Sequence, residues 1–267
     1  MKINELIEEI GIIPGMNIIV HSSIRQIRKI IPSLIPLELI NQLKIKLTIK
    51  GSLIMPTFTY CFKKNDTNYE VFDLLNSKSK VGALTEIFRL QNDVIRTSSP
   101  THSFALWGKV VKYFEENNSP KSPLGKGSIM EWLSGLEDSY VLLLGCDFNS
   151  LTFGHYLEII NEVPWANISP WDHLGVLPIG VSKNGEQALA QVPGCSKSFN
   201  NFKDYLLNQN IITQEKRGDF TFYLIPINTL IKYSTDFFST QQNMLICPQG
   251  SCLPCDERRM KLKTRLD

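Results

Sequence analysis

The amino-acid sequence predicts an α/β protein, with a layered α/β/α first half and a β-rich antiparallel C-terminal section, in a single compact domain over residues 1–267. Three observations support this fold class. Through about residue 165, short apolar runs bounded by turn residues alternate with amphipathic stretches of helical spacing. From about 165 to 230, short alternating runs are separated by turn signals. The chain contains no internal repeat and no low-complexity linker.

The first half is expected to alternate helices with buried strands. Gly11 and Gly51 end helical patterns, and Pro56 stops a strand. The polar stretch 61–80 predicts a surface loop. In chain order, the predicted elements are a helix at 3–10, a strand at 17–20, a helix at 36–47, a strand at 52–55, a helix at 83–90, strands at 103–107 and 140–145, and a helix that follows.

The second half shows the pattern of antiparallel strands. Asn184-Gly185 is a strong hairpin signal, because both positions of that turn type need a positive φ. Short apolar runs at 177–180 and 220–225 lie on either side of it. A β-rich section is therefore expected here, followed by a cysteine-rich tail.

Composition excludes several classes of function. Apolar residues make up 43% of the chain and charged residues 20%, as in ordinary globular proteins, and the net charge of +2 gives no field that would recruit nucleic acid. No apolar stretch reaches the ~20 residues that a membrane helix requires. The N-terminal segment does not resemble a signal peptide, so a cytoplasmic location is expected, with the six cysteines as thiols or metal ligands.

The segment Leu151–Glu158 carries the most informative side chains. It follows an apolar run that predicts a buried strand, and it predicts the first turns of a helix. His155 and Glu158, at positions i and i+3, share one helix face with Thr152 nearby, so the imidazole and carboxylate can act at one place. His155 is a candidate general base, and Glu158 a candidate for the acid that orients it. The alternative is a buried histidine bonded to a backbone carbonyl.

Two hydroxyl-rich loops are candidate ligand sites. His21-Ser22-Ser23 follows a predicted strand, where backbone N–H groups and hydroxyls suit a phosphate or an amide-bearing ligand, although either serine could equally cap a helix. Arg96 precedes a second loop, Pro100-Thr101-His102-Ser103, and could hold an anionic group. The alternative for this loop is a turn with local hydrogen bonds.

The cysteines of the C-terminal tail suggest a metal site. Cys252 and Cys255 have the Cys-x-x-Cys spacing of metal-binding turns, and Cys247 adds a third thiol. Cys195 is a candidate fourth ligand for a structural zinc ion. The alternative is a set of reduced thiols in a proline-rich tail.

These clusters, in this order, resemble the antibiotic N-acetyltransferase family, named for the aminoglycoside 3-N-acetyltransferases. Each match is unspecific alone, but they are collinear over roughly residues 1–165. The matching segments are Ile19-Val20-His21-Ser22-Ser23, Ile54-Met55-Pro56-Thr57-Phe58-Thr59, Val81 to Arg89, Ser99-Pro100-Thr101-His102-Ser103, and Leu142 to Gly145 followed by Thr152, His155 and Glu158.

The resemblance implies transfer of acetyl from acetyl-CoA to a primary amine. His155 would be the general base, with Asp73 or Glu158 as its acidic partner, and Thr152 would face the reacting thioester. The loops at 21–23 and 100–103 would line the CoA arm. CoA binding and catalysis would reside mainly in residues 1–165, and the expected partner is a small-molecule amine, bound by a monomer or homodimer.

One departure from the family bears on the acceptor. The stretch from Thr59 to Val81 is short and basic, whereas drug-modifying members resemble one another in a longer, acid-rich insertion. Polycationic aminoglycosides need carboxylates, so an aminosugar, possibly nucleotide-linked, is an alternative acceptor. Two other hypotheses stay open at this stage: a metal-dependent hydrolase that uses His155, Glu158 and the cysteines, and a non-catalytic module that binds CoA or a nucleotide.

Overall fold

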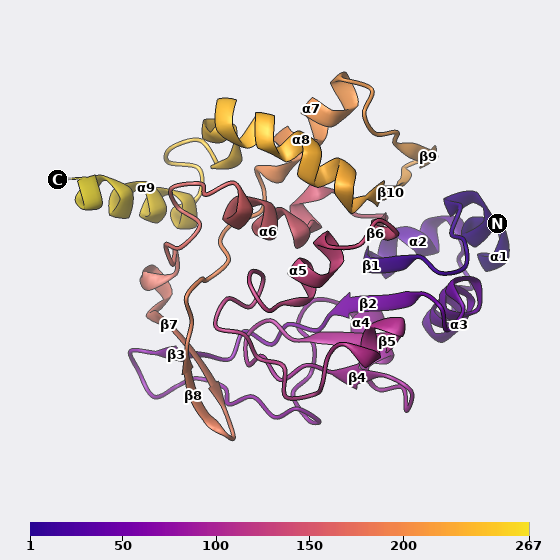
Figure 1. The fold of residues 1–267 in the computed structure, drawn as a ribbon, viewed down its shortest axis with the longest axis horizontal. Helices are drawn as coiled ribbons and strands as arrows, with labels where there is room; N and C mark the ends of the chain where they lie inside the picture. The colour runs from indigo at the N-terminus through magenta and orange to yellow at the C-terminus, as the bar shows by residue number, and fades with distance from the viewer. Residues whose placement is uncertain (267) are drawn as a thin grey trace.

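The computed structural model describes residues 1–266, which are built around a mixed β-sheet (Figure 1). Within these residues the sheet has seven strands in the order β4-β5-β2-β1-β6-β10-β9. The three central strands, β2, β1 and β6, are parallel, and the flanking strands are antiparallel to their neighbours. The strands are β1 (Asn17–Ser22), β2 (Ser52–Pro56), β4 (Ile95–Arg96), β5 (Phe104–Gly108), β6 (Ser139–Leu144), β9 (Glu215–Arg217) and β10 (Phe220–Pro226).

A smaller sheet and a set of helices complete the fold. The small sheet has the order β3-β7-β8, from β3 (Phe62–Lys64), β7 (Val176–Ser182) and β8 (Gly185–Ala188). The α-helices of the described chain are α1 (Ile3–Ile10), α2 (Ile24–Ile30), α3 (Pro36–Leu47), α4 (Ala83–Arg89), α5 (Ile129–Ser134), α6 (Phe153–Ile160), α7 (Phe199–Asn208), α8 (Ile227–Thr240) and α9 (Leu253–Leu266). Short 3₁₀ turns lie at Lys109–Lys112, Phe148–Ser150, Asp172–Leu174 and Gln242–Leu245.

Helices cover both faces of the large sheet, which confirms the predicted α/β layering. Because successive side chains of a strand point to opposite faces, Val141 and Leu143 of β6 join one apolar core, and Leu142 and Leu144 join the other. The first core packs against α5, α6, α7 and α8, and the second against α1 to α4. Continuous apolar strands such as β6 are what burial on both faces requires.

The second half of the chain contains more helix than its sequence pattern suggested. It supplies the hairpin β7–β8, with the predicted turn at Asn184-Gly185, and the antiparallel strand β10. It also supplies α7 and α8, which complete the layer against the first core, and α9, which ends on the same side of the molecule as the small sheet (Figure 1). Within the described residues, none of the helices combines the length and apolar character needed to cross a membrane.

Candidate active site

A hydrogen-bonded histidine–carboxylate pair lies in α6. Nδ1 of His155 lies 2.7 Å from Oε2 of Glu158, at the predicted spacing of i and i+3. The second carboxylate oxygen accepts a 2.9 Å hydrogen bond from Nε1 of Trp165, and Nη1 of Arg258 lies 3.7 Å from it. Because the Glu158 side chain is only 1% exposed, these interactions are made away from water. Three partners therefore hold the carboxylate in one orientation.

These partners also set the ionisation of Glu158. Burial alone would raise the pKa of its carboxyl, but the hydrogen bond and charge of His155, the charge of Arg258 and the Trp165 indole together lower it. Glu158 is thus an anion at neutral pH, and it accepts the proton on Nδ1 of His155. This hydrogen bond assigns the tautomer in which Nε2 of His155 is the basic nitrogen.

His155 lines a cavity of about 1030 Å³ at the carboxyl-terminal edge of the parallel strands. Open α/β sheets commonly bind ligands at this edge. The wall includes the end of β1, Pro56 of β2 and the start of α6, and it extends to Trp171 and His173 beyond the first half of the chain. Small-ligand cavities occupy ~300–1,000 Å³, so this one is large enough for more than one reactant.

Two further histidines line the same cavity, and burial keeps both neutral. Burial lowers the pKa of His21 to about 4, and burial together with the charge of His155 lowers the pKa of His102 to about 3. Nδ1 of His102 lies 2.9 Å from the Thr101 hydroxyl, and its ring packs edge-on against Phe58. Nε2 of His21 is buried and has no hydrogen-bond partner among residues 1–266. A bound ligand could supply that partner.

The first candidate loop, His21-Ser22-Ser23, has two roles in the structure. His21 and Ser22 end β1 and line the cavity. Ser23 is the N-cap of α2, where its hydroxyl accepts a 3.4 Å hydrogen bond from the backbone N–H of Gln26. The capping alternative therefore describes Ser23, and only the first two residues of the loop face a ligand.

Arg96 has a structural position. It is 5% exposed, and its guanidinium donates to the backbone oxygens of Thr57 and Ser77. It also donates to the Ser103 hydroxyl and stacks on the ring of Phe72. With its donors used inside the protein, the structure places Arg96 behind the cavity wall and not in contact with a ligand.

The rest of the second loop also supports the wall. The carbonyl oxygen of Pro100 accepts a hydrogen bond from the Thr59 hydroxyl, and that of Thr101 accepts one from the N–H of Tyr60. Ser103 donates to the Thr57 carbonyl. In the described chain, His102 is the member of this loop that lines the cavity.

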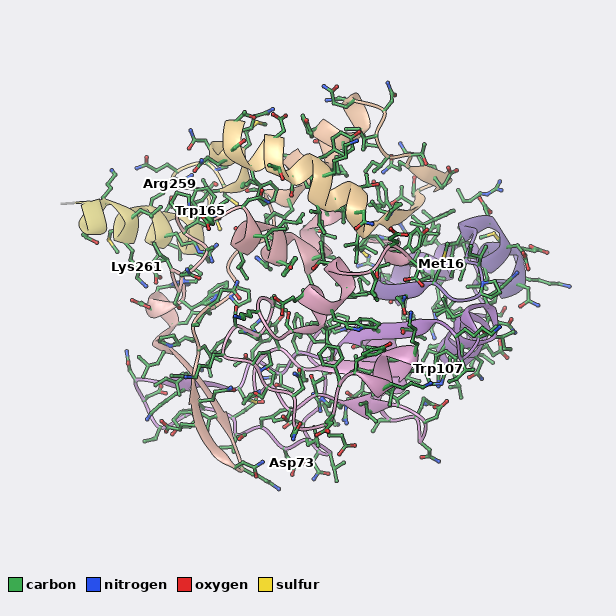
Figure 2. The ribbon with its side chains drawn as sticks, viewed as in Figure 1. Met16, Asp73, Trp107, Trp165, Arg259 and Lys261 are labelled. Carbon is green, nitrogen blue, oxygen red and sulfur yellow. The ribbon has the colours of Figure 1, made fainter. Side chains whose placement is uncertain are left out.

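Asp73 lies far from the histidine–carboxylate pair. Its carboxylate accepts hydrogen bonds from the N–H groups of Leu75 and Asn76 and forms an ion pair with Lys183. The Lys183 ammonium and the hydrogen bonds from residues 75 and 76 lower the pKa of Asp73. Figure 2 shows Asp73 at the opposite edge of the molecule from Trp165, the residue bonded to Glu158. The acid that contacts His155 is therefore Glu158.

The start of α6 brings an aromatic ring against the catalytic candidate. Thr152 occupies the N-cap position and lines the cavity. The ring of Phe199 packs edge-on against His155, with centroids 5.0 Å apart. A Cβ atom on Gly154 would lie 2.4 Å from Cε2 of Phe199, so this approach requires glycine at position 154.

The four candidate metal ligands come together in the structure. The sulfur atoms of Cys195, Cys247, Cys252 and Cys255 all lie within 4.8 Å of one another. Cys195 and Cys252 also line the large cavity, so the cluster forms part of the wall that faces His155. Cys61, by contrast, is a fully buried core residue, as expected.

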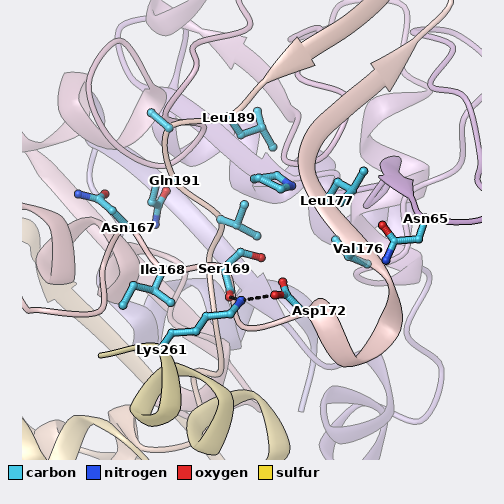
Figure 3. Close-up of a pocket in the computed structure, with 13 residues that line it drawn as sticks. Asn65, Asn167, Ile168, Ser169, Asp172, Val176, Leu177, Leu189, Gln191 and Lys261 are labelled. Carbon is cyan, nitrogen blue, oxygen red and sulfur yellow. Dashed lines mark hydrogen bonds and ion pairs between the residues drawn. The ribbon is translucent and has the colours of Figure 1, made fainter. Parts of the chain in front are cut away.

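A second cavity, of about 520 Å³, adjoins the first at Val176, which lines both (Figure 3). It lies between the small sheet and α9. The ammonium of Lys261 is already paired there, at 2.7 Å from Oδ2 of Asp172 and 2.6 Å from the backbone oxygen of Ser169. This cavity is polar and narrower, and it lacks the histidine–carboxylate pair.

Three residues of the site had no assignment from the sequence. Gly154, between two larger residues in a helix, was a possible signal of a close approach, since glycine weakens a helix. Trp165 and Arg258 gave no local signal, because both reach Glu158 only through the tertiary fold.

The fold is that of the aminoglycoside acetyltransferases. The apoenzyme structure of aminoglycoside acetyltransferase AAC(3)-IVa superposes with a TM-score of 0.79 over 97% of this chain and 95% of that one, at 22% identity. The family model for aminoglycoside 3-N-acetyltransferase matches residues 19–239. The chain belongs to the aminoglycoside 3-N-acetyltransferase family, as its sequence motifs indicated.

Two curated relatives agree with this family. An SPβ prophage-derived aminoglycoside N(3′)-acetyltransferase-like protein, YokD, of Bacillus subtilis strain 168 is 29% identical over 191 residues, which cover 62% of this chain and 66% of the relative. Aminoglycoside N(3)-acetyltransferase IV of Salmonella sp is 30% identical over 159 residues, 58% of this chain and 57% of the relative. The matched regions thus span less than two thirds of each relative's length.

Proposed function

We propose that this protein is an acetyl-CoA-dependent N-acetyltransferase that acetylates a primary amine of an aminoglycoside or aminosugar, with His155 as general base. The observation that carries the proposal is the ordered His155–Glu158 pair at the wall of a cavity large enough for two reactants. Family membership supplies the reaction class. A structural neighbour solved as a binary complex with CoASH supports the cosubstrate.

The proposed reaction needs a base at the position of His155. A primary amine is mostly protonated at neutral pH, because its pKa resembles that of lysine, near 10. Nε2 of His155 would remove a proton as the amine nitrogen attacks the thioester carbonyl. The C–N bond forms, the C–S bond breaks, and the proton passes to the CoA thiolate that leaves. The Glu158 carboxylate stabilises the imidazolium formed in between, and such a base contributes ~10²–10⁴-fold.

Other cavity residues would bind and polarise the thioester arm. The Thr152 hydroxyl, at the entrance to α6, is placed to donate to the oxyanion of the tetrahedral intermediate. His21 and Ser22 would contact the CoA arm, and the unpartnered Nε2 of His21 supports this assignment. The location of most CoA contacts in residues 1–165 stays a prediction.

The charges of the cavity bear on the acceptor. Among the described residues that line it there is no aspartate or glutamate, whereas Lys64 and Lys197 are present. AAC(3)-IVa, as a histidine-to-alanine mutant, was solved in complex with a gentamicin, and such polycations require carboxylates for binding. The lining of this cavity therefore favours an acceptor with few positive charges, such as an aminosugar, over a polycationic drug.

The alternative of a metal-dependent hydrolase has less support. The cysteine cluster and His155 do share one cavity, although they are distant in sequence. However, four sulfur ligands would complete a tetrahedral shell, and a catalytic metal needs an open position. The non-catalytic binding module differs from our proposal only in turnover.

The test is thiol release from acetyl-CoA with the wild type and His155→Ala, over a panel of aminoglycosides and of free and nucleotide-linked amino-hexoses. We expect turnover with at least one amine, reduced ~10²–10⁴-fold in the variant while CoA affinity is kept. CoA binding without turnover for any amine would favour the binding module. Absence of CoA binding would overturn the proposal.

A further inference from the structure

Four thiols converge from three separate segments of the chain. Cys195 lies in the strand-free segment after β8, Cys247 follows the 3₁₀ turn after α8, and Cys252 and Cys255 lie at the start of α9. All four sulfur atoms are within 4.8 Å of one another, and those of Cys195 and Cys247 are 3.7 Å apart. Tetrahedral zinc with Zn–S distances of ~2.3 Å places its sulfur ligands ~3.8 Å apart. A disulfide would require ~2.05 Å and would use only two of the thiols.

We infer that these four cysteines form a structural zinc site that anchors α9 and, through it, places Arg258 behind the catalytic carboxylate. The donor set supports zinc, because soft thiolates select it over hard cations such as Mg²⁺ or Ca²⁺. The surroundings support thiolates: the Ser198 hydroxyl lies 3.2 Å from the Cys247 sulfur, and the N–H of Lys197 lies 3.5 Å from the Cys195 sulfur. Donors of this kind stabilise and orient metal-bound sulfur.

The link to the active site runs along one turn of α9. Arg258 follows Cys255 by three residues and is 2% exposed. Its Nε donates to the backbone oxygen of Ile168 at 3.1 Å, its Nη2 to that of Val192 at 3.3 Å, and its Nη1 lies 3.7 Å from Oε1 of Glu158.

The segment that carries Cys195 closes the other side of this arginine. A Cβ atom on the neighbouring Gly194 would lie 2.3 Å from Nη1 of Arg258. Zinc bound by Cys195 and Cys255 would therefore fix both the helix that carries the guanidinium and the backbone that packs on it. The same ion would fix the part of the cavity wall formed by Cys195 and Cys252.

Metal content is the first measurement. The protein is purified without chelator from zinc-supplemented cells, and we expect about one zinc ion per chain, released when a mercurial reagent titrates the thiols. Cys255→Ser should lose the zinc, and Cys146→Ser, outside the cluster, should keep it. Zinc far below one per chain in the wild type, or a Cys195–Cys247 disulfide found by mass spectrometry, would overturn the site.

Cobalt substitution tests the ligands without a variant that could misfold. Co²⁺ in a tetrahedral thiolate site gives intense sulfur-to-metal absorption, which octahedral oxygen sites lack. We expect this spectrum from the wild-type chain after exchange, and its absence would contradict four-sulfur ligation.

Trypsin sensitivity of α9 tests the anchoring role independently of acetyl transfer. After zinc is removed from the folded protein, we expect cleavage at Arg259 and Lys261 to become roughly tenfold faster, because local opening exposes the helix. Cleavage in β-sheet regions should change little. Equal cleavage rates of α9 with and without zinc would show that the metal does not anchor it.

Discussion

Gly154 lies directly under the ring of Phe199, and this contact sets the position of the ring that packs against His155. Nothing larger than a hydrogen atom fits on residue 154, since a Cβ atom there would lie 2.4 Å from Cε2 of Phe199. The aromatic wall beside the catalytic candidate thus depends on a glycine in the middle of a helix.

Gly154→Ala should therefore impair the protein although alanine favours helices. Overpacking a buried site costs about 1–3 kcal/mol, and displacement of Phe199 should also lower kcat. Urea unfolding and steady-state kinetics measure the two effects. Gly135→Ala is the matched control, because a Cβ atom there meets its nearest neighbour at 3.7 Å. Equal behaviour of the two variants would contradict the packing argument.

Glu158→Gln should lower kcat by roughly 10²–10⁴-fold, because a neutral amide no longer stabilises the imidazolium or fixes its tautomer. Asp73→Asn, the change at the other acid considered from the sequence, should leave kcat within about twofold, since Asp73 bonds to its own loop and to Lys183. Thiol release from acetyl-CoA distinguishes the two. A larger loss from Asp73→Asn would reverse our assignment of the acid.

Arg258→Met should move the acidic limb of the pH–activity profile to higher pH. The groups that face Glu158 are His155, Trp165 and Arg258, and loss of the guanidinium removes a charge that lowers the pKa of Glu158. The histidine–carboxylate pair then binds a proton more readily, so activity is lost at a higher pH. The measurement is kcat/KM against pH, with Arg258→Lys expected to show a smaller shift. Superimposable profiles for wild type and Arg258→Met would rule out this role.

Acid should destabilise the fold through its buried histidines. The pKa of His21 falls from 6.5 to about 4 on folding, so between these values the unfolded chain binds a proton that the folded chain does not. The free energy of unfolding should therefore decrease as pH falls below 6.5, by on the order of 3 kcal/mol from His21 when pH reaches its folded pKa. His102 acts in the same direction, over a range that extends to about pH 3.

Urea unfolding at several pH values measures this slope. His21→Gln removes one titrating group, so stability of the variant should depend less steeply on pH than that of the wild type. An unchanged slope would mean that His21 does not titrate on unfolding in the way its burial requires.

Local patterns predicted the parts of the site that are local in the chain. The pairing of His155 with Glu158 follows from one helical turn, and the apolar run at 140–145 predicted the central strand β6. The sequence left Asp73 and Glu158 as competing acids, because distance in the fold is not readable from spacing along the chain.

Polar loops were harder to interpret from residue types. Arg96 among hydroxyls has the composition of an anion site, yet three backbone and side-chain acceptors use its donors inside the protein. Ser23 could cap a helix or bind a ligand, and the choice depends on α2, a short helix with little periodicity. Arg258 and Trp165 reach Glu158 through tertiary packing alone, so no local signal could identify them.

The strand order also determines how this chain emerges during translation. Strands β1, β2, β4, β5 and β6 can pair once residue 144 has left the ribosome, but one side of β6 waits for β10 at residues 220–226. Until then a nascent chain presents an apolar strand, Val141 to Leu144, with an open hydrogen-bonding edge. Such an edge is a template for aggregation. Synthesis of the intervening segment is therefore the interval in which this protein depends most on chaperones that bind nascent chains.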